Sequence, residues 1–272
     1  MEPLTVVGSG LAVLGSKDIL TKLLGPTADY VGGEIRGFVE KCNVNLDNVF
    51  VKAVRKLGER LDEKGTVSAR VLRHVVDEGR FCEDEIVAEY YGGVLASSRS
   101  PSGRDDRGVA LLSVIKSLSV YQVRFHCLVY ALMRQHYFGQ DLNLGDQHDC
   151  LKMRLFIPTP VYDKAMEFSS DENGGAIMIH CLFGLKKQDL LHDMLSGDPD
   201  FLYPRFPSLK DKGPGMIVSP SILGAELYLW ASGVSGASGA ELLSASVPSI
   251  ASPIEIVEGS FPLSVDWRVG VR

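Results

Sequence analysis

The clearest candidates for chemistry are two histidines and a cysteine in the second half of the chain. His180 and Cys181 follow an apolar run, and His192 stands next to Asp193 farther along. A thiol beside an imidazole can form a nucleophile and base pair, and the same atoms can bind a metal ion. Their spacing matches neither one helix face nor a hairpin. A single histidine on an apolar run is more often a hydrogen-bonded core residue, so we expect neither a catalytic nor a metal site here.

Other motifs that would indicate an enzyme or a cofactor are incomplete. The chain has no Walker A loop, GxSxG elbow or HExxH helix. Gly8–Gly10 resembles a dinucleotide loop, but the third glycine would fall at Val13. His126 and His136 have no obvious third ligand in His74 or His148. We therefore expect no cofactor, and the binding residues are unknown at this stage.

Cysteine use indicates a reducing compartment. The five cysteines are an odd number, and no two have the CxxC spacing of a zinc or redox site. Reduced and mostly buried thiols in a cytoplasmic protein are the simplest account. The five are Cys42, Cys82, Cys127, Cys150 and Cys181.

Charge patterning makes nucleic acid an unlikely partner. The formal net charge is −6, whereas nucleic-acid binders usually carry a basic excess. One basic group, within residues 52–60, is interleaved with acids, and we expect it to be a solvated helix face. Its members are Lys52, Arg55, Lys56 and Arg60, among Glu59, Asp62 and Glu63. Tyr90 and Tyr91 could stack on a base, but core packing is the more ordinary role.

The first half of the chain has helical periodicity throughout. Apolar residues recur at helical spacing from residue 16 to about 65, and again over 71–76, 86–95 and 109–138. Glu83–Glu85 would form the first turn of one helix, where carboxylates interact favourably with the helix dipole. Ser119 is a suitable N-cap. Residues 98–108 have the composition of a flexible exposed loop.

After Gly139 the pattern changes. The runs 153–157 and 176–179 could be strands or short buried helices, whereas 182–195 has the pattern of a helix and 198–215 that of a long loop. Ser219 and Pro220 favour a helix start, with Gly233 as its end. A tether rich in Ser, Gly and Ala is expected near 232–252, followed by one or two strands in 253–271.

These patterns predict a mainly α protein with an N-terminal helical bundle followed by a smaller α+β domain. We expect an apolar arm at 1–15, the helical domain at 16–138 and the α+β domain at 150–272. A chain of 272 residues is long enough to bury a core in each.

Four segments of the first half resemble the Abi-alpha family, a bacterial family named for abortive infection. The resemblance covers roughly residues 20–135, with a weaker match at 219–224. Tyr90–Gly93 replaces the tryptophan and alanine-rich stretch of the family. The segments are Leu24-Gly25-Pro26-Thr27-Ala28-Asp29-Tyr30-Val31-Gly32, Val67-Ser68-Ala69-Arg70-Val71-Leu72, Phe81-Cys82-Glu83-Asp84-Glu85-Ile86 with Leu95-Ala96-Ser97, and Ile115-Lys116-Ser117-Leu118-Ser119.

The resemblance implies a non-enzymatic phage-defence protein that acts through protein or membrane contact, and it carries over no catalytic residues. Two alternatives stay open. One is a hydrolase or nuclease with an unrecognised site around His180, Cys181 and His192. The other is a structural or regulatory subunit, which would co-purify with a stoichiometric partner.

The apolar segment 4–14 carries no charge and is about half the ~20 residues of a spanning helix. It also lacks the basic leading region of a signal peptide, since Glu2 is the only charge before Lys17. Apolar patches of this kind are seldom left in water. We expect the arm to be buried on the chain itself, in a homo-oligomer or on a membrane, in a protein that is cytoplasmic or membrane-associated.

Deleting residues 1–15 tests that expectation. If the arm mediates association, the truncated protein should lose mass in size-exclusion chromatography with light scattering, or should stop floating with liposomes. Two monomeric, non-floating proteins would contradict both association and membrane contact, leaving the arm as a local element.

Overall fold

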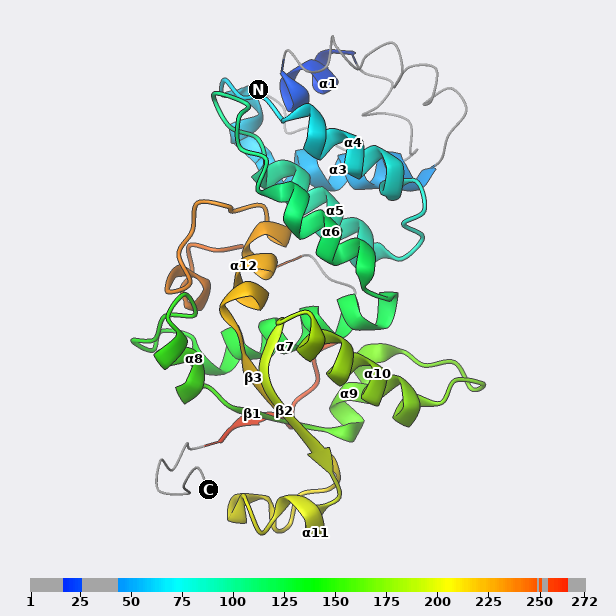
Figure 1. The fold of residues 1–272 in the computed structure, drawn as a ribbon, viewed down its shortest axis with the longest axis vertical. Coiled ribbons are helices and arrows are strands. Elements are labelled where there is room, and N and C mark those ends of the chain that lie inside the picture. Colours follow the sequence, from blue (N-terminus) through cyan, green and yellow to red (C-terminus); the bar gives the residue numbers. More distant parts are fainter. Residues whose placement is uncertain (1–16, 26–43, 249, 251–253, 264–272) are drawn as a thin grey trace. The chain divides into compact units, whose positions relative to one another are not determined.

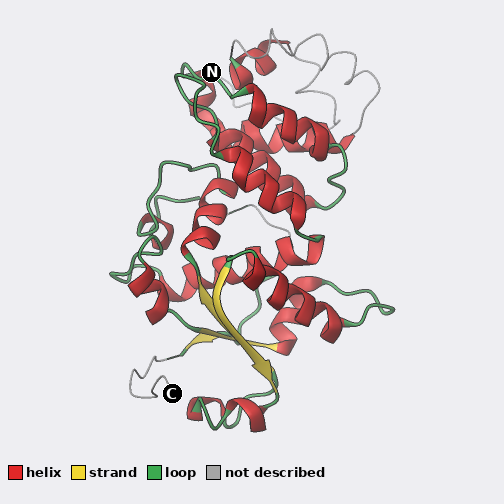
Figure 2. Cartoon of the chain, viewed as in Figure 1, coloured by secondary structure: helices red, strands yellow, loops and turns green. Residues whose placement is uncertain are grey.

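The computed structural model describes residues 17–25, 44–248, 250 and 254–263, and these are mainly helical with a small four-stranded antiparallel sheet (Figures 1 and 2). The arm at 1–15 lies outside the described residues. The chain divides into two compact units, Met1–Lys116 and Ser117–Arg272. The division falls earlier than the expected boundary near 138–150, because the long helix that follows Ser119 packs on elements of the second unit.

Helix α5 is the centre of the first unit. It packs against α3 and α4, and nearly all of its side chains are buried. The spacing of its apolar residues predicts a helix with one apolar face and one polar face. In the structure α5 is buried on nearly all sides, so it has no solvent-exposed polar face. Asp84 caps this helix by accepting hydrogen bonds from the amides of Ile86 and Val87. The described elements of the unit are α1 (Lys17–Leu24), α3 (Val44–Leu57), the 3-10 helix η1 (Gly58–Asp62), α4 (Ala69–Gly79), α5 (Glu85–Ser97) and α6 (Gly108–Ser117).

The loop after α5 is tied down where it begins, unlike the freely flexible loop expected for 98–108. Ser100 and Thr66 form an isolated antiparallel bridge. The guanidinium of Arg99 donates to the backbone carbonyls of Lys22, Arg60, Leu61 and Glu63. The Arg99 side chain thereby bonds to the backbone near the ends of both α1 and η1. It can do so because a guanidinium has several N–H donors in fixed directions.

The second unit holds all the described strands, arranged in the order β2-β3-β1-β4 with antiparallel pairing. Helix α7 is its main packing element and contacts α9, α10, α12, η3 and β3. Ser119 begins α7 with a capping box shared with Gln122, which confirms the predicted N-cap. The helices are α7 (Val120–Tyr137), α8 (Gln147–Lys152), α9 (Thr159–Met166), α10 (Gly174–Lys187), α11 (Pro199–Leu202), η2 (Pro207–Leu209), α12 (Ile222–Ala231) and η3 (Glu241–Leu243), and the strands are β1 (Leu155–Pro158), β2 (Leu191–Gly197), β3 (Gly215–Pro220) and β4 (Phe261–Pro262).

Two helix predictions in this unit are wrong. The segment 182–195 is not one helix, because α10 ends at Lys187 and Asp189 turns the chain with a φ of 55° before β2 begins. Ser219 and Pro220 do not start a helix either, since they close strand β3. The N-cap of α12 is Ser221, whose hydroxyl accepts from the Gly224 amide at 3.0 Å. In both places pairing between β2 and β3 overrides a local helical pattern.

The stretch expected as a tether packs on α7 instead. Leu242, Leu243 and Val247 are almost fully buried. Arg134 of α7 donates to the carbonyls of Ser244 and Val247. Three spaced apolar side chains are enough to anchor a Ser/Gly/Ala-rich chain, because each burial contributes roughly 1.5–3 kcal/mol. Gly233 ends α12 with a φ of 87°, as expected.

The buried hydroxyl of Tyr130 joins three elements of the second unit. It donates to the Leu190 carbonyl at 2.9 Å and accepts from the Ser221 amide at 3.0 Å. It therefore fixes the start of β2 and the entry to α12 against α7. Gly224 leaves room for this arrangement, since a Cβ there would overlap both the Tyr130 hydroxyl and the Leu190 carbonyl.

Gly224→Ala should lower the unfolding free energy by about 1–3 kcal/mol or more, because the methyl group overpacks a fully buried contact. The matched control is Gly175→Ala on the exposed first turn of α10, where a Cβ meets only ordinary contacts. That variant should be neutral or stabilised by less than about 1 kcal/mol. Urea unfolding followed by tryptophan fluorescence measures the effect, as Trp230 is buried in this unit. Equal midpoints for both variants would contradict the packing argument.

Candidate functional site

The histidines and cysteine singled out in the sequence do not form a contacting set. The ring of exposed His180 lies 3.0 Å from the Ser119 hydroxyl. Cys181 is its neighbour on α10 but is fully buried, and its sulfur meets the Tyr162 hydroxyl at 3.9 Å. Burial raises the pKa of Cys181 to about 12, so the thiol stays protonated. His192 lies on β2 and offers its backbone carbonyl to Lys186.

The remaining histidines of interest are structural. His126 is fully buried with a ring nitrogen 3.1 Å from the Gly224 carbonyl, and burial lowers its pKa to about 3. His136 lies 2.9 Å from the Ser260 hydroxyl, and partial burial lowers its pKa. Within the described part of the chain, no group of three or more His, Cys, Asp or Glu side chains is placed to hold a metal ion.

The thiols and the paired tyrosines lie in the core. Tyr90 and Tyr91 are buried, in keeping with core packing. Four of the cysteines are buried thiols, as expected, while Cys42 lies outside the described residues. The four are Cys82, Cys127, Cys150 and Cys181.

The basic group within residues 52–60 is only in part the solvated face that its pattern predicts, because Arg55 and Arg60 are exposed whereas Lys52 and Lys56 are not. The side chains of Lys52 and Lys56 are each only 7% exposed, and with Arg55 they converge on Glu89 of α5. The ammonium of Lys52 lies 2.9 Å from one Glu89 oxygen, and that of Lys56 lies 2.6 Å from the other. Lys52 also meets Glu85 at 2.6 Å. The spacing of the acids near these basic residues could not predict that Glu89 is their partner, because Glu89 lies on another helix, α5.

The electrostatics of this cluster keep Glu89 ionised. Burial favours the neutral acid, but the charges of Lys56 and Lys52 outweigh it and hold the pKa of Glu89 below its usual value. Burial is also the main cause that lowers the pKa of Lys56, with repulsion from Arg55 and Lys52 added to it and attraction to Glu89 opposing it. An ionised carboxylate surrounded by cations is a poor proton donor. The cluster therefore has a structural role. We call these ion pairs, which join α3 to Glu89 of α5, the clamp.

Glu89→Gln should lower the unfolding free energy by about 3–5 kcal/mol at neutral pH, because it leaves buried cations without their carboxylate. Since the folded-state pKa is depressed, the contribution of Glu89 is fully present above about pH 4.5 and is lost as the pH falls through the folded value. The difference between wild type and variant should therefore shrink in acid.

Urea unfolding followed by far-ultraviolet circular dichroism at neutral pH and at about pH 3.5 measures both effects. Exposed Glu59 on η1 supplies the control, and Glu59→Gln should match wild type. A Glu89→Gln protein as stable as wild type would show that the clamp contributes nothing.

A different kind of site lies on the connection between β2 and β3, which carries α11 and η2 (Figure 1). We call residues 198–212 the contact surface. Two aromatic side chains are exposed on it, Phe201 at 44% and Tyr203 at 39%. The guanidinium of Arg205 lies 4.6 Å from the Phe201 ring centre, and the ammonium of Lys210 lies 5.9 Å from that of Tyr203.

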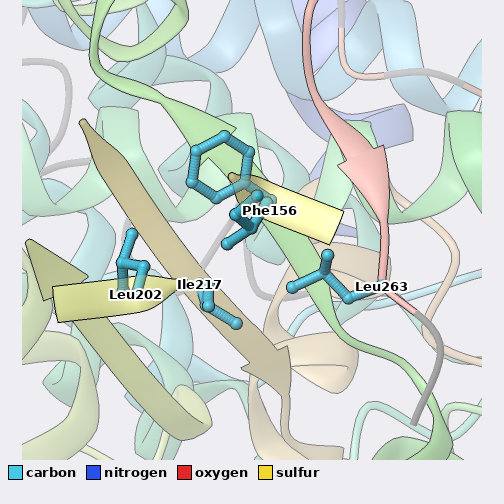
Figure 3. Packing of buried hydrophobic residues seen from close by; sticks show 5 residues of the cluster. Phe156, Leu202, Ile217 and Leu263 are labelled. Carbon is cyan, nitrogen blue, oxygen red and sulfur yellow. The ribbon is translucent and has the colours of Figure 1, made fainter. Parts of the chain in front are cut away.

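The contact surface is held by a hydrophobic cluster beneath it. Leu202 and Leu209 are the members of the cluster that belong to the connection, while Phe156 and Ile217 belong to β1 and β3. Figure 3 shows Leu202 beside Ile217, with Phe156 and Leu263 completing the cluster. Two leucines are thus buried, while Phe201 and Tyr203 stay partly exposed. The structure gives a long irregular segment a fixed outer face.

Cations extend along the same surface. Besides Arg205 and Lys210 it carries Lys212, which lies 5.3 Å from the Phe261 ring. Arg154, which is not part of residues 198–212, lies 5.6 Å from the ring of Phe206. Asp198, Asp200 and Asp211 are exposed on the same stretch and equal in number the three cations of residues 198–212, so the contact surface carries no net formal charge. The surface can therefore bind through aromatic burial with modest help from charge. The sequence pattern predicts only a long loop here, although three aromatic and three basic residues fall within it.

Comparison with protein-family models, with curated proteins and with solved structures finds no match for this chain. The resemblance to Abi-alpha therefore stays a prediction from its motifs. Among the described helices, none has both the length and the apolar character needed to cross a bilayer.

Proposed function

We propose that this chain is a non-enzymatic protein of the abortive-infection type that acts by contact, and that its contact surface binds an anionic membrane surface. The exposed rings of Phe201 and Tyr203, each with a cation over it, are the observation that carries the proposal. Aromatic rings favour the boundary between water and lipid, and neighbouring basic groups are attracted to anionic headgroups.

The proposal includes the features expected from the sequence. The chain would be a helical bundle followed by an α+β domain, cytoplasmic, and bound peripherally to the membrane. The apolar segment 4–14 would provide a second contact, with the membrane or with another copy in a homo-oligomer. The segregation of the described strands in the second unit supports this arrangement. Burial of the Cys181 thiol argues against the rival hydrolase or nuclease, because a protonated buried thiol is a poor nucleophile.

Flotation with vesicles that contain anionic lipid tests the surface. Replacing Phe201 and Tyr203 together by serine should lower the bound fraction about tenfold or more, because burial of one large apolar side chain contributes roughly 1.5–3 kcal/mol. Phe183→Ser is the matched control, since Phe183 is 61% exposed but lies on α10 away from this surface. Equal loss in both variants, or no binding by the wild type, would contradict the proposal.

The biological part of the proposal is tested in bacteria that express the chain and are challenged with a phage panel. The wild type should reduce plaque counts or arrest growth when overexpressed, and the Phe201/Tyr203 variant should not. Alanine at His180, Cys181 and His192 should leave the phenotype intact if the protein folds. Unchanged plaque counts and growth with the wild type would count against a defence role, and loss of activity in the folded alanine variant would revive the enzyme.

A further inference from the structure

The side of α10 that faces solvent is apolar, which is unusual for a surface helix. Helix α10 packs against α7 and β2, and Cys181, Leu182 and Leu185 are fully buried on the inner side (Figure 1). On the outer side Ile179 is 43% exposed and Phe183 is 61% exposed. The outer side of a surface helix normally carries polar and charged residues. The described part of the chain leaves this apolar side of α10 uncovered.

Helical geometry gathers the exposed apolar residues of α10 in one stripe. Ala176, Ile179 and Phe183 follow one another at i, i+3 and i+7, so they share one helix face. We call this face the α10 stripe. Residues 174–185 include no Asp, Glu, Lys or Arg, so the middle of the stripe carries no formal charge. Exposed apolar surface of this kind is characteristic of sites where another protein binds.

The two ends of α10 differ in the sign of their charge. Asp171 and Glu172 lie in the turn before the helix, whereas Lys186 and Lys187 lie in its last turn. Asp189, two residues past the lysines, offsets only one of them. Two parallel copies of α10 would bring like charges together, but two antiparallel copies bring opposite charges together. The charge pattern therefore fits a second copy of the same helix in the antiparallel direction.

The residues at the ends of the stripe are available for such contacts. Asp171 and Lys187 are both exposed, and neither has an ion-pair partner among the described residues. The hydrogen bond that Asp171 forms with Ser169 is to a neutral group, so it leaves the charge of the carboxylate in place. That bond is the main cause that lowers the pKa of Asp171, which keeps the carboxylate ionised at neutral pH.

A two-fold axis at Ile179 satisfies both the shape and the charge of the stripe. Residues that are equally far from Ile179 in the sequence then face each other, so Phe183 of one copy meets Gly175 of the other. Gly175 leaves room for the ring, because a Cβ added there would make only one ordinary contact, at 3.6 Å. The same axis brings Asp171 of one copy to Lys187 of the other, since each lies eight residues from Ile179.

We infer that the α10 stripe is a homodimer interface, in which two copies of α10 pair antiparallel about a two-fold axis at Ile179. Such an interface is isologous, as in most dimers. A helix of 14 residues is about 21 Å long, so the paired helices bury less than the roughly 1,200 Å² of a standard interface. The dimer is therefore weak, with a Kd between about 1 µM and 1 mM. The inference depends neither on the contact surface nor on a defence role.

Sedimentation velocity of the full chain across about 1 µM to 1 mM measures the dimer, and the wild type should shift from monomer to dimer. Ile179→Asp should weaken the dimer at least about tenfold, because it brings two carboxylates together on the axis of an apolar interface. Phe81→Asp is the matched control, since Phe81 is 69% exposed but belongs to the first unit. A wild type that stays monomeric, or an Ile179→Asp protein that dimerises like it, would overturn the proposal.

Charge reversal tests the antiparallel register. Asp171→Lys and Lys187→Glu should each weaken the dimer about threefold or more, because each places two like-charged pairs across the interface. The variant with both substitutions should regain wild-type affinity, since opposite charges face each other again. Circular dichroism confirms that each variant is folded. Single variants that dimerise like the wild type, or a double variant that stays as weak as the single ones, would overturn the register.

Two further variants separate the α10 stripe from other surfaces. Deletion of residues 1–15 should leave this dimer intact, and so should the Phe201/Tyr203 variant. Loss of the dimer on deletion, together with wild-type dimerisation of Ile179→Asp, would assign association to the apolar arm and overturn the proposal. Phe183→Ser should weaken self-association, so its flotation is compared at a protein concentration at which the wild type is monomeric.

Discussion

The carboxylate of Glu89 cannot reach water, and the first unit is built around that constraint. Helix α5 is buried on every side, so its acid must find cations on a neighbouring helix. Lys52 and Lys56, one turn apart on α3, supply them. The two helices can approach closely because Gly92 faces the Val49 carbonyl, where an added Cβ would lie only 2.7 Å away. An ionised buried acid is stable only while these partners stay in place, so the clamp fixes how α3 and α5 pair.

Two buried polar side chains of the second unit are satisfied by neutral hydrogen bonds. Tyr130 and His126, both on α7, bond to backbone groups at Leu190, Ser221 and Gly224. Burial raises the pKa of Tyr130 and lowers that of His126 to about 3, so both side chains stay uncharged. Shifted pKa values often mark active sites. Here the pKa shifts follow from burial, and the two side chains bond to the main chain. Both residues therefore have a structural role.

The groups that face solvent are of a different kind. Phe201 and Tyr203 expose part of their apolar surface next to cations, on a segment anchored by buried leucines. A surface of this kind offers apolar area and charged groups to a binding partner.

Local patterns determined much of this protein. Helical spacing indicated α4, α5, α6 and α7, and Ser119 was recognisable as a cap because capping depends on neighbours only three residues apart. Tertiary contacts decided the rest. Residues 191–195 became a strand because β3 was available to pair with them, and Lys52 and Lys56 were buried because Glu89 lies opposite them on α5. The contact surface is likewise a tertiary product, since Leu202 and Leu209 point inward only where Phe156 and Ile217 receive them. Contacts between residues that are far apart in the sequence produce no local periodic pattern. The roles of these residues could therefore not be predicted from the sequence alone.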